Sequence, residues 1–280
     1  MTKIAFLTEE LSRYSAISNY TFSMIRELSE TFSISLFSFA IDEHFLRNNL
    51  AQKVTVNFFT DRHEHVFSEE IKTMIYPSGV ANRLKEHDLV VISTDRPVPI
   101  PVLLAKHIRR SLKLVWDFHG ITPLELLGHQ NVRRYLIELF RIGVAKKLLG
   151  RCDFCIVHSN FMGEEAGERF AKVPTVVIPY GIDTRRFSPK IDGGPVRQKY
   201  DLNDKFTLLY VGRLVPSKRV HFIVAAMAKL RDPTMRFLVV GEGDEKKRLK
   251  EYVKSMSLRD QVIFTGHVSD EELPMIYSAS

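Results

Sequence analysis

Cysteines and long apolar runs are both scarce in this chain of 280 residues. The two cysteines, Cys152 and Cys155, stand three positions apart, and such a pair cannot build the disulfide framework on which small secreted proteins depend. The longest apolar stretches, such as residues 102–105, fall far short of the ~18 residues that span a bilayer. The first ten residues contain only a short apolar run before two acids, so we expect no signal peptide. These absences favour a protein of the reducing cytoplasm.

The overall composition excludes several other classes of protein. Apolar residues make up 45% of the chain and charged residues 26%, which is close to the soluble average and unlike collagen-like, disordered or low-complexity sequences. Lys and Arg number 40 against 33 acids, which gives a formal net charge of +7. This excess favours an anionic partner without choosing among phosphates, nucleic acid and acidic lipid.

Short apolar runs alternate with amphipathic segments along the first 178 residues. This pattern is typical of parallel strands that crossover helices bury on both faces, and it predicts an α/β fold with a doubly wound parallel sheet. The predicted strands are 3–8, 33–39, 54–59, 89–93, 112–116, 154–158 and 175–178, and the clearest helices are 17–29, 132–149 and 161–170.

A cluster of turn residues over 179–195 reads as a connection between two domains. We place the domains at 1–190 and 191–280. The second domain shows three strand–helix units, with strands at 206–211, 237–241 and 261–265 and helices at 218–230, 245–256 and 269–277. A complete doubly wound sheet has about six strands, so we expect the second domain to be incomplete.

The most informative motif lies where the strand 206–211 ends and the following helix begins. Open α/β sheets bind ligands at that edge, and free backbone N–H groups there attract anions. Gly212 lets the backbone approach a ligand closely, Arg213 offers a planar donor fork, and Lys218 offers a mobile positive charge. The segment lacks the spacing of a P-loop or a dinucleotide fingerprint. It suits a diphosphate, and the alternative is a solvated basic start of a helix.

The motif formed by Gly212, Arg213 and Lys218 resembles the donor-binding signature of group 1, family-4 type glycosyltransferases. Three further segments resemble motifs of that family in the same order: 178–189, 241–249 and 262–277. The resemblance implies the GT-B fold, in which two Rossmann-like domains face each other, the first an acceptor domain and the second a nucleotide-sugar donor domain.

The resemblance also implies roles for individual residues. Arg213 and Lys218, with Gly212, would bind the donor diphosphate and stabilise the negative charge of the leaving group. Gly266, His267 and Val268 would lie against the nucleobase, and Gly241 and Gly243 would shape a turn. In the first domain His119 follows a strand and would help to bind the donor sugar or the acceptor near the reacting centre, where an imidazole can donate or accept a proton. We assign the neighbouring Asp117 no catalytic role.

The sequence departs from the family pattern in three places. The loop after the first strand, represented by Ser15, Ala16 and Asn19, carries no glycine where the family has a glycine-rich loop beside the donor and acceptor. Tyr180 stands where the family often has Asn. The acidic Glu-x7-Glu pair of the family would lie beyond residue 280.

Other motifs point away from metal and nucleic-acid chemistry. The Cys152–Cys155 pair has no second pair to complete a zinc site, so we expect both cysteines to be packing residues. The chain has neither a His-Glu-x-x-His pattern nor an Asp-x-Asp motif, and we expect neither a bound metal nor a resident cofactor. Basic residues are scattered without a nucleic-acid motif. The basic amphipathic helix predicted at 132–149 is either a crossover helix or a peripheral contact with the inner face of a membrane.

These observations lead to one main hypothesis and two rivals. We expect a retaining glycosyltransferase that moves a sugar from a nucleoside-diphosphate sugar, as co-substrate, to a hydroxyl of a sugar or lipid-linked acceptor. One rival is a truncated, non-catalytic protein that binds a nucleotide. The other is a nucleotide-sugar epimerase on the same fold, which would need no acceptor.

Overall fold

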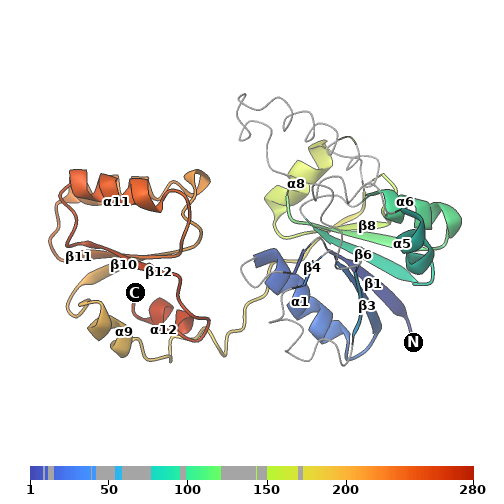
Figure 1. The fold of residues 1–280 in the computed structure, drawn as a ribbon, viewed down its shortest axis with the longest axis horizontal. Helices are drawn as coiled ribbons and strands as arrows, with labels where there is room; N and C mark the ends of the chain where they lie inside the picture. Colours follow the sequence, from blue (N-terminus) through green and yellow to red (C-terminus); the bar gives the residue numbers. More distant parts are fainter. Residues whose placement is uncertain are drawn as a thin grey trace. The chain divides into compact units, whose positions relative to one another are not determined.

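The computed structural model describes residues 1–8, 10–11, 16–38, 40–41, 54–58, 77–94, 99–120, 143, 150–169 and 173–280. The chain forms two compact units, Met1–Gly181 and Ile182–Ser280, shown in Figure 1. The division lies in the connecting segment, earlier than the predicted boundary at 190/191. The predicted helix at 132–149 and the residue Ser15 lie outside the described residues.

The first unit is built on a seven-stranded parallel sheet in the order β5-β3-β1-β6-β7-β8-β9. Its strands are β1 (Lys3–Leu7), β3 (Ser33–Ser38), β5 (Val54–Phe58), β6 (Leu89–Thr94), β7 (Lys113–Phe118), β8 (Phe154–Val157) and β9 (Thr175–Val177). All seven predicted strands are present, each within two residues of its expected ends. The strand order reverses between β1 and β6, which is the point where doubly wound sheets bind their ligands.

Helices cover both faces of this sheet. They are α1 (Ala16–Leu28), α5 (Pro77–Leu84), α6 (Pro99–Ile108) and α8 (Asn160–Arg169), and a further two-stranded sheet pairs β2 (Glu10–Leu11) with β4 (Ala40–Ile41). Residues of α5, α6 and α8 pack with Leu7, Ile92 and Trp116 on one face, and those of α1 pack with Phe6 and Leu36 on the other. The central strands are therefore buried on both sides, as their near-continuous apolar sequences predict, while the edge strand β9 is exposed.

The sequence prediction missed α5 and α6, and their prolines explain why. Pro77, Pro99 and Pro101 look like turn residues in a linear sequence. In the structure Pro77 and Pro99 open their helices, where the missing N–H has no intrahelical partner to lose. Proline at these positions therefore marks a helix start instead of a loop.

The second unit has a three-stranded parallel sheet in the order β10-β11-β12. Its elements are α9 (Gly194–Lys199), β10 (Phe206–Val211), η3 (Pro216–Lys218), α10 (His221–Leu230), β11 (Met235–Val240), α11 (Lys246–Ser255), β12 (Val262–Gly266) and α12 (Leu273–Ser278). Side chains of α10 and α11 pack with Phe237 and Val239 on one face of the sheet, and those of α9 and α12 pack with Leu238 and Val240 on the other.

Two helices of the second unit begin later than predicted. The helix expected from residue 218 starts at His221, because Pro216–Lys218 form a separate 3₁₀ turn and Arg219 adopts a left-handed conformation with φ 50°. The helix expected from residue 269 starts at Leu273, after a turn in which the Glu272 N–H donates to the Ser269 hydroxyl at 3.2 Å. Lys218 therefore lies at the end of the 3₁₀ turn and not in α10.

Among the residues that the structure describes, no helix combines the length and the apolar content that crossing a bilayer requires.

The end of α10 offers a first test of the structure. Arg231 caps this helix in the left-handed region, with φ 55°, a conformation that costs an L-residue with a Cβ roughly 1–2 kcal/mol and costs glycine little. Because glycine also makes the unfolded chain more flexible, we expect Arg231→Gly to stabilise the second unit by a net ~0.5–1 kcal/mol. Native-state hydrogen exchange of β10 and β11 measures this change. Arg231→Ala is the matched control, and an equal gain from alanine would show that removal of the charge is the cause.

Candidate functional site

Polar side chains gather at the carboxyl ends of three neighbouring strands of the first unit. Ser93 lies in β6 opposite Asp117 in β7. His119 directly follows the last residue of β7, and His158 directly follows the last residue of β8. The strand β7 runs to Phe118, two residues beyond its predicted end, so Asp117 belongs to the strand and is buried. These side chains lie next to the point where the strand order reverses, which is the usual ligand edge of such a sheet.

Asp117 is the centre of this group. Its Oδ1 lies 3.0 Å from His158 Nε2, and its Oδ2 lies 3.2 Å from His119 Nε2. The Ser93 hydroxyl donates to Oδ2 at 2.8 Å, and the Thr21 hydroxyl lies 2.7 Å from the Ser93 oxygen. Burial alone would raise the pKa of Asp117, but the hydrogen bonds from His119, His158 and Ser93 more than offset it, and the pKa is lowered. The carboxylate is therefore charged at neutral pH.

His158 carries the counter-charge. Its Nδ1 lies 2.8 Å from the carbonyl oxygen of Ile178, so that nitrogen must hold a proton, and its Nε2 faces the carboxylate. Burial alone would lower the pKa of His158, but Asp117 and the Ile178 carbonyl together raise it above the ordinary value. Because both nitrogens of His158 face oxygen acceptors, His158 and Asp117 form a buried ion pair.

His119 bridges the buried pair and Tyr180. Its Nε2 points to Asp117 and lies 3.1 Å from the Ser93 oxygen, and its Nδ1 lies 2.7 Å from the Tyr180 hydroxyl. Burial raises the pKa of Tyr180 to about 12, with a further contribution from the charge of Asp117, so the phenol stays protonated. Because Nε2 faces the acceptor oxygens of Ser93 and Asp117, the ring proton lies there and Nδ1 accepts from the phenol. The network therefore assigns the His119 proton to Nε2.

Four aromatic rings enclose this network. The rings of His119 and His158 are stacked, with centroids 4.8 Å apart, and the ring of Tyr180 stacks on His158 at 3.9 Å. Tyr20, from α1, meets all three rings edge-on at 5.0 to 5.8 Å. Burial raises the pKa of Tyr20, and the charge of Asp117 raises it further, so this phenol also stays neutral.

Asp117, His119 and His158 are also the right residue types for a metal site, and their ligand atoms lie within 4.8 Å of one another. The ring planes of the two histidines are only 15° from parallel, so their nitrogen lone pairs do not converge on a common point. Each Nε2 instead faces its own oxygen of Asp117. This geometry fits a carboxylate shared by two imidazoles better than a tetrahedral metal site.

Three loops meet at the carboxyl edge of the second unit's sheet. The N–H of Gly212 donates to Val240 O at 3.0 Å, and that of Leu214 donates to Glu242 O at 2.8 Å. The N–H of Gly241 donates to Gly266 O at 2.8 Å. The loops after β10, β11 and β12 are thus joined by backbone hydrogen bonds into one surface.

Gly241 and Gly243 make this close approach of the loops feasible. A Cβ at Gly241 would lie 2.0 Å from Gly212 O, and a Cβ at Gly243 would lie 2.3 Å from Leu214 O. Both residues also have positive φ angles, 131° and 152°. The two glycines therefore shape the turn, which is the structural role that the sequence predicted for them.

Arg213 and Lys218 are both exposed on this edge. Among the described residues neither forms an ion pair with an acid. The Tyr210 hydroxyl donates to the carbonyl oxygen of Arg213 at 2.7 Å and holds the turn. Two unpaired cations beside a glycine-lined strand end can neutralise a diphosphate.

Comparison with known proteins covers both units. A family model described as Glycosyltransferase Family 4 matches residues 17–186, more than half of the chain, and one described as Glycosyl transferases group 1 matches residues 195–280. The chain belongs to glycosyltransferase family 4. One curated relative is a protein of Mycolicibacterium smegmatis described as GDP-mannose-dependent alpha-(1-6)-phosphatidylinositol monomannoside mannosyltransferase. It is 28% identical to this chain over 191 residues, which cover 61% of this chain and 49% of the relative.

Further relatives agree with this assignment. The putative glycosyltransferase YtcC of Bacillus subtilis is 26% identical and shares 72% of this chain and 50% of its own length. The chain therefore spans about half the length of these curated relatives. Among solved structures, Anabaena HepE in complex with UDP and glucose matches with a TM-score of 0.76 at 21% identity, covering 100% of this chain and 72% of HepE. WaaG, a glycosyltransferase of lipopolysaccharide biosynthesis, matches with a TM-score of 0.70 at 15% identity, covering 99% of this chain and 73% of WaaG. The fold of the family-4 chain is GT-B.

The remaining predicted site residues are not brought together by a common set of contacts between their described side chains. Gly266 ends β12 with φ 77° and joins the loop surface, and His267 beside it is exposed. Val268 packs partly into the core with α9 and α12. Asn19 is exposed on α1, and the side chain of Ala16 is outside the description. The nucleobase and loop assignments of these residues therefore stay predictions.

The sequence analysis missed most of the side chains that surround Asp117 in the first unit. It named His119 but gave no role to Asp117, Ser93 or His158, and it noted Tyr180 only as a departure from the family. The available signal was that Ser93, Asp117 and His158 all occur at the ends of predicted strands, whose carboxyl ends share one edge. Tyr20 gave no such signal, because it lies on a helix.

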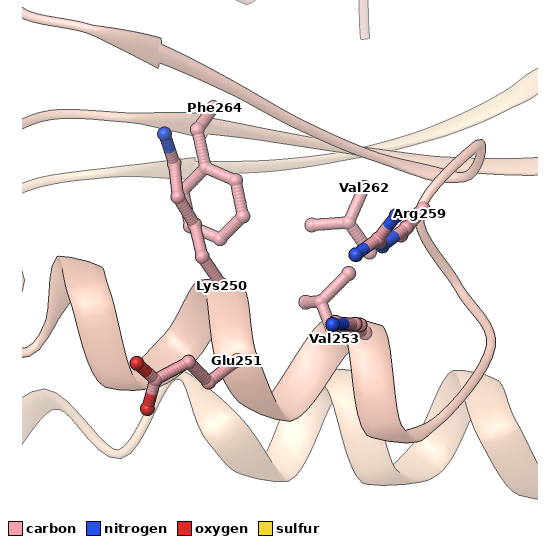
Figure 2. Close-up of a pocket in the computed structure, with 7 residues that line it drawn as sticks. Lys250, Glu251, Val253, Arg259, Val262 and Phe264 are labelled. Carbon is pink, nitrogen blue, oxygen red and sulfur yellow. The ribbon is translucent and has the colours of Figure 1, made fainter.

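A groove in the second unit lies between α11 and β12 (Figure 2). Its lining consists of Lys250, Glu251, Val253, Lys254, Arg259, Val262 and Phe264. The Lys250 ammonium lies 5.7 Å from the centre of the Phe264 ring. The groove holds none of the predicted site residues, and its cations are those of a solvated basic helix.

Proposed function

We propose that this protein is a retaining glycosyltransferase that moves a sugar from a nucleoside-diphosphate sugar to an acceptor hydroxyl. The observation that carries the proposal is the pair of exposed, unpaired cations, Arg213 and Lys218, beside the joined loops after β10, β11 and β12. As the bond between sugar and diphosphate breaks, negative charge grows on the leaving diphosphate. Cations fixed at that place stabilise the transition state more than the ground state.

The relatives support a nucleotide-sugar donor and leave its base open. HepE is described in complex with UDP and glucose, and the relative from Mycolicibacterium smegmatis is described as GDP-mannose-dependent. Both descriptions share a nucleoside diphosphate and a hexose. In the proposed reaction Arg213 and Lys218 neutralise the diphosphate, so the donor half-site needs no metal or resident cofactor.

In the proposed reaction the first unit binds the acceptor. His119, whose Nε2 faces Ser93 and Asp117, offers Nδ1 as a hydrogen-bond acceptor for a sugar hydroxyl that replaces the Tyr180 hydroxyl. A sugar or a lipid-linked acceptor fits this role. The membrane contact proposed for residues 132–149 rests on sequence alone, since those residues are outside the described part of the chain apart from residue 143.

Binding of nucleotide sugars to the full chain is the direct test. Differential scanning calorimetry is run with UDP, GDP, UDP-glucose and GDP-mannose, and with uridine and guanosine as controls that lack the diphosphate. A ligand at about 100 times its Kd stabilises the folded form by about 2.7 kcal/mol. We expect at least one diphosphate ligand to raise Tm and both nucleosides to leave it unchanged. If no nucleotide sugar raises Tm, the proposal is wrong.

The reaction type is tested separately with the bound donor. NMR of the product formed with a sugar acceptor reports the configuration at the anomeric carbon, which we expect to be retained. Release of an altered free sugar in the absence of any acceptor would favour the epimerase instead.

A further inference from the structure

His119 is completely covered, although it lies at the ligand edge of the sheet. The exposed fraction of its side chain is 0%. Tyr180, which is 48% exposed, contacts it from the solvent side through the bond between the hydroxyl and Nδ1. A side chain without exposed surface cannot contact a substrate unless a covering group moves. In this structure the half-exposed group bonded to His119 is Tyr180.

Tyr180 occupies the nitrogen of His119 that a substrate would use. The Nε2 atom is directed into the protein, at 3.2 Å from Asp117 Oδ2. The Nδ1 atom accepts the hydrogen bond from the Tyr180 hydroxyl at 2.7 Å. A phenol hydroxyl and a sugar hydroxyl are alike as hydrogen-bond donors, so the tyrosine makes the contact that a sugar hydroxyl would make.

The backbone around Tyr180 leaves the side chain free to turn. The last anchored residue before it is Ile178, whose N–H donates to Val157 O at 2.8 Å and whose carbonyl accepts from His158. In the described part of the chain, residues 179–182 form no backbone hydrogen bond. Gly181 is the last residue of the first unit. The ring is held by side-chain contacts: the bond to His119, the stack on His158 at 3.9 Å and the edge-on contact with Tyr20 at 5.0 Å.

We propose that Tyr180 is a gating residue, whose hydroxyl holds the place of a substrate hydroxyl on His119 Nδ1 and whose ring turns away when the substrate binds. That the substrate is a sugar rests on the proposed function. The cover over His119 does not, because it follows from the contacts alone. The gate makes His119 available only when a ligand supplies a hydroxyl that replaces the phenol.

Carbethoxylation of histidines by diethyl pyrocarbonate, mapped by mass spectrometry on the full chain, tests the cover without any substrate. Labelling reports the population of open molecules, so we expect His119 to react at least about tenfold faster in Tyr180→Asn and Tyr180→Ala than in the wild type. Tyr180→Phe is the matched comparison, because its ring keeps the stack on His158 but no longer bonds Nδ1, and its rate should lie between those of the wild type and Tyr180→Ala. Exposed His107 and buried His87 should keep their rates in every variant, which shows that the fold is intact.

The gate fails if His119 in the wild type reacts as fast as His107, or if its rate is the same in Tyr180→Asn and Tyr180→Ala as in the wild type. The wild-type measurement stands even if a variant does not fold. Steady-state kinetics with the substrate provide a second test. We expect Tyr180→Asn to lower KM about fivefold and to leave kcat unchanged, because the substrate no longer competes with the hydrogen bond from the phenol to His119. Faster labelling without nucleotide-sugar binding would keep the gate and reject the transferase. Nucleotide-sugar binding with unchanged labelling would do the reverse.

Discussion

Asp117→Asn should lower the free energy of unfolding of the first unit by about 3 kcal/mol, because it removes the buried carboxylate that pairs with His158 and accepts from Ser93. The side chains of Asp117 and His158 are 0% and 1% exposed, so water cannot replace the lost carboxylate. Asparagine keeps the shape of aspartate, and the loss therefore reports the charge and not a cavity.

The pH dependence of this loss identifies the pair. The pKa of Asp117 is lowered in the folded protein, so its stabilisation is present above the ordinary pKa of ~3.9 and disappears as the pH falls through the folded value. The pKa of His158 is raised, so its stabilisation is complete below the ordinary ~6.5 and disappears as the pH rises through the folded value. The difference between wild type and Asp117→Asn should therefore be largest between about pH 4 and 6.5.

The measurement uses a natural probe. Trp116 is the single tryptophan of the chain, is 1% exposed and precedes Asp117 in β7. Urea unfolding followed by its fluorescence therefore reports on the first unit alone. Asp88→Asn is the matched control, because the Asp88 carboxylate is half exposed in its pair with Arg109, and we expect a much smaller loss there. A difference for Asp117→Asn that does not vary with pH would contradict the buried ion pair.

The sequence predicts those features of the fold whose physical constraint acts on residues close together in the chain. The strands of the first unit were predictable because each is a short apolar run, and burial of the central strands on both faces leaves a direct mark on the residue types. The end of β10 was predictable because Gly212 directly follows the apolar run of the strand. In both cases the physical constraint is local in the sequence.

The network around Asp117 was not predictable, because its constraint is not local. Tyr20, Ser93, His158 and Tyr180 come from four separate segments, and their meeting depends on the order of the strands. A polar residue at a strand end has the same local signature whether it faces water or a buried carboxylate. Asp117 is buried because β7 extends to Phe118. The two added residues pair with β6, so the Asp117 carboxylate lies beside Ser93 of that strand.

Removal of both proposed donor cations should have the largest effect on binding. We expect Arg213→Ala with Lys218→Ala to weaken the binding of a nucleoside diphosphate about 100-fold, since charge-assisted hydrogen bonds to phosphate contribute about 1.5 kcal/mol or more each. A nucleoside has no diphosphate, and its binding should stay within about twofold. Isothermal titration calorimetry with the same base in both ligands measures the two losses side by side.

The control for this double variant must remove the same charge elsewhere. Lys229→Ala with Arg231→Ala removes two exposed cations at the far end of α10, so the net charge changes equally. If the general field of the protein attracts the diphosphate, both double variants weaken binding alike, and high salt abolishes the difference from the wild type. If Arg213 and Lys218 contact the phosphates, only their removal has the large effect. Equal losses for the nucleoside and the nucleoside diphosphate would remove the diphosphate role from these two residues, because a contact to phosphate cannot weaken a ligand that has none.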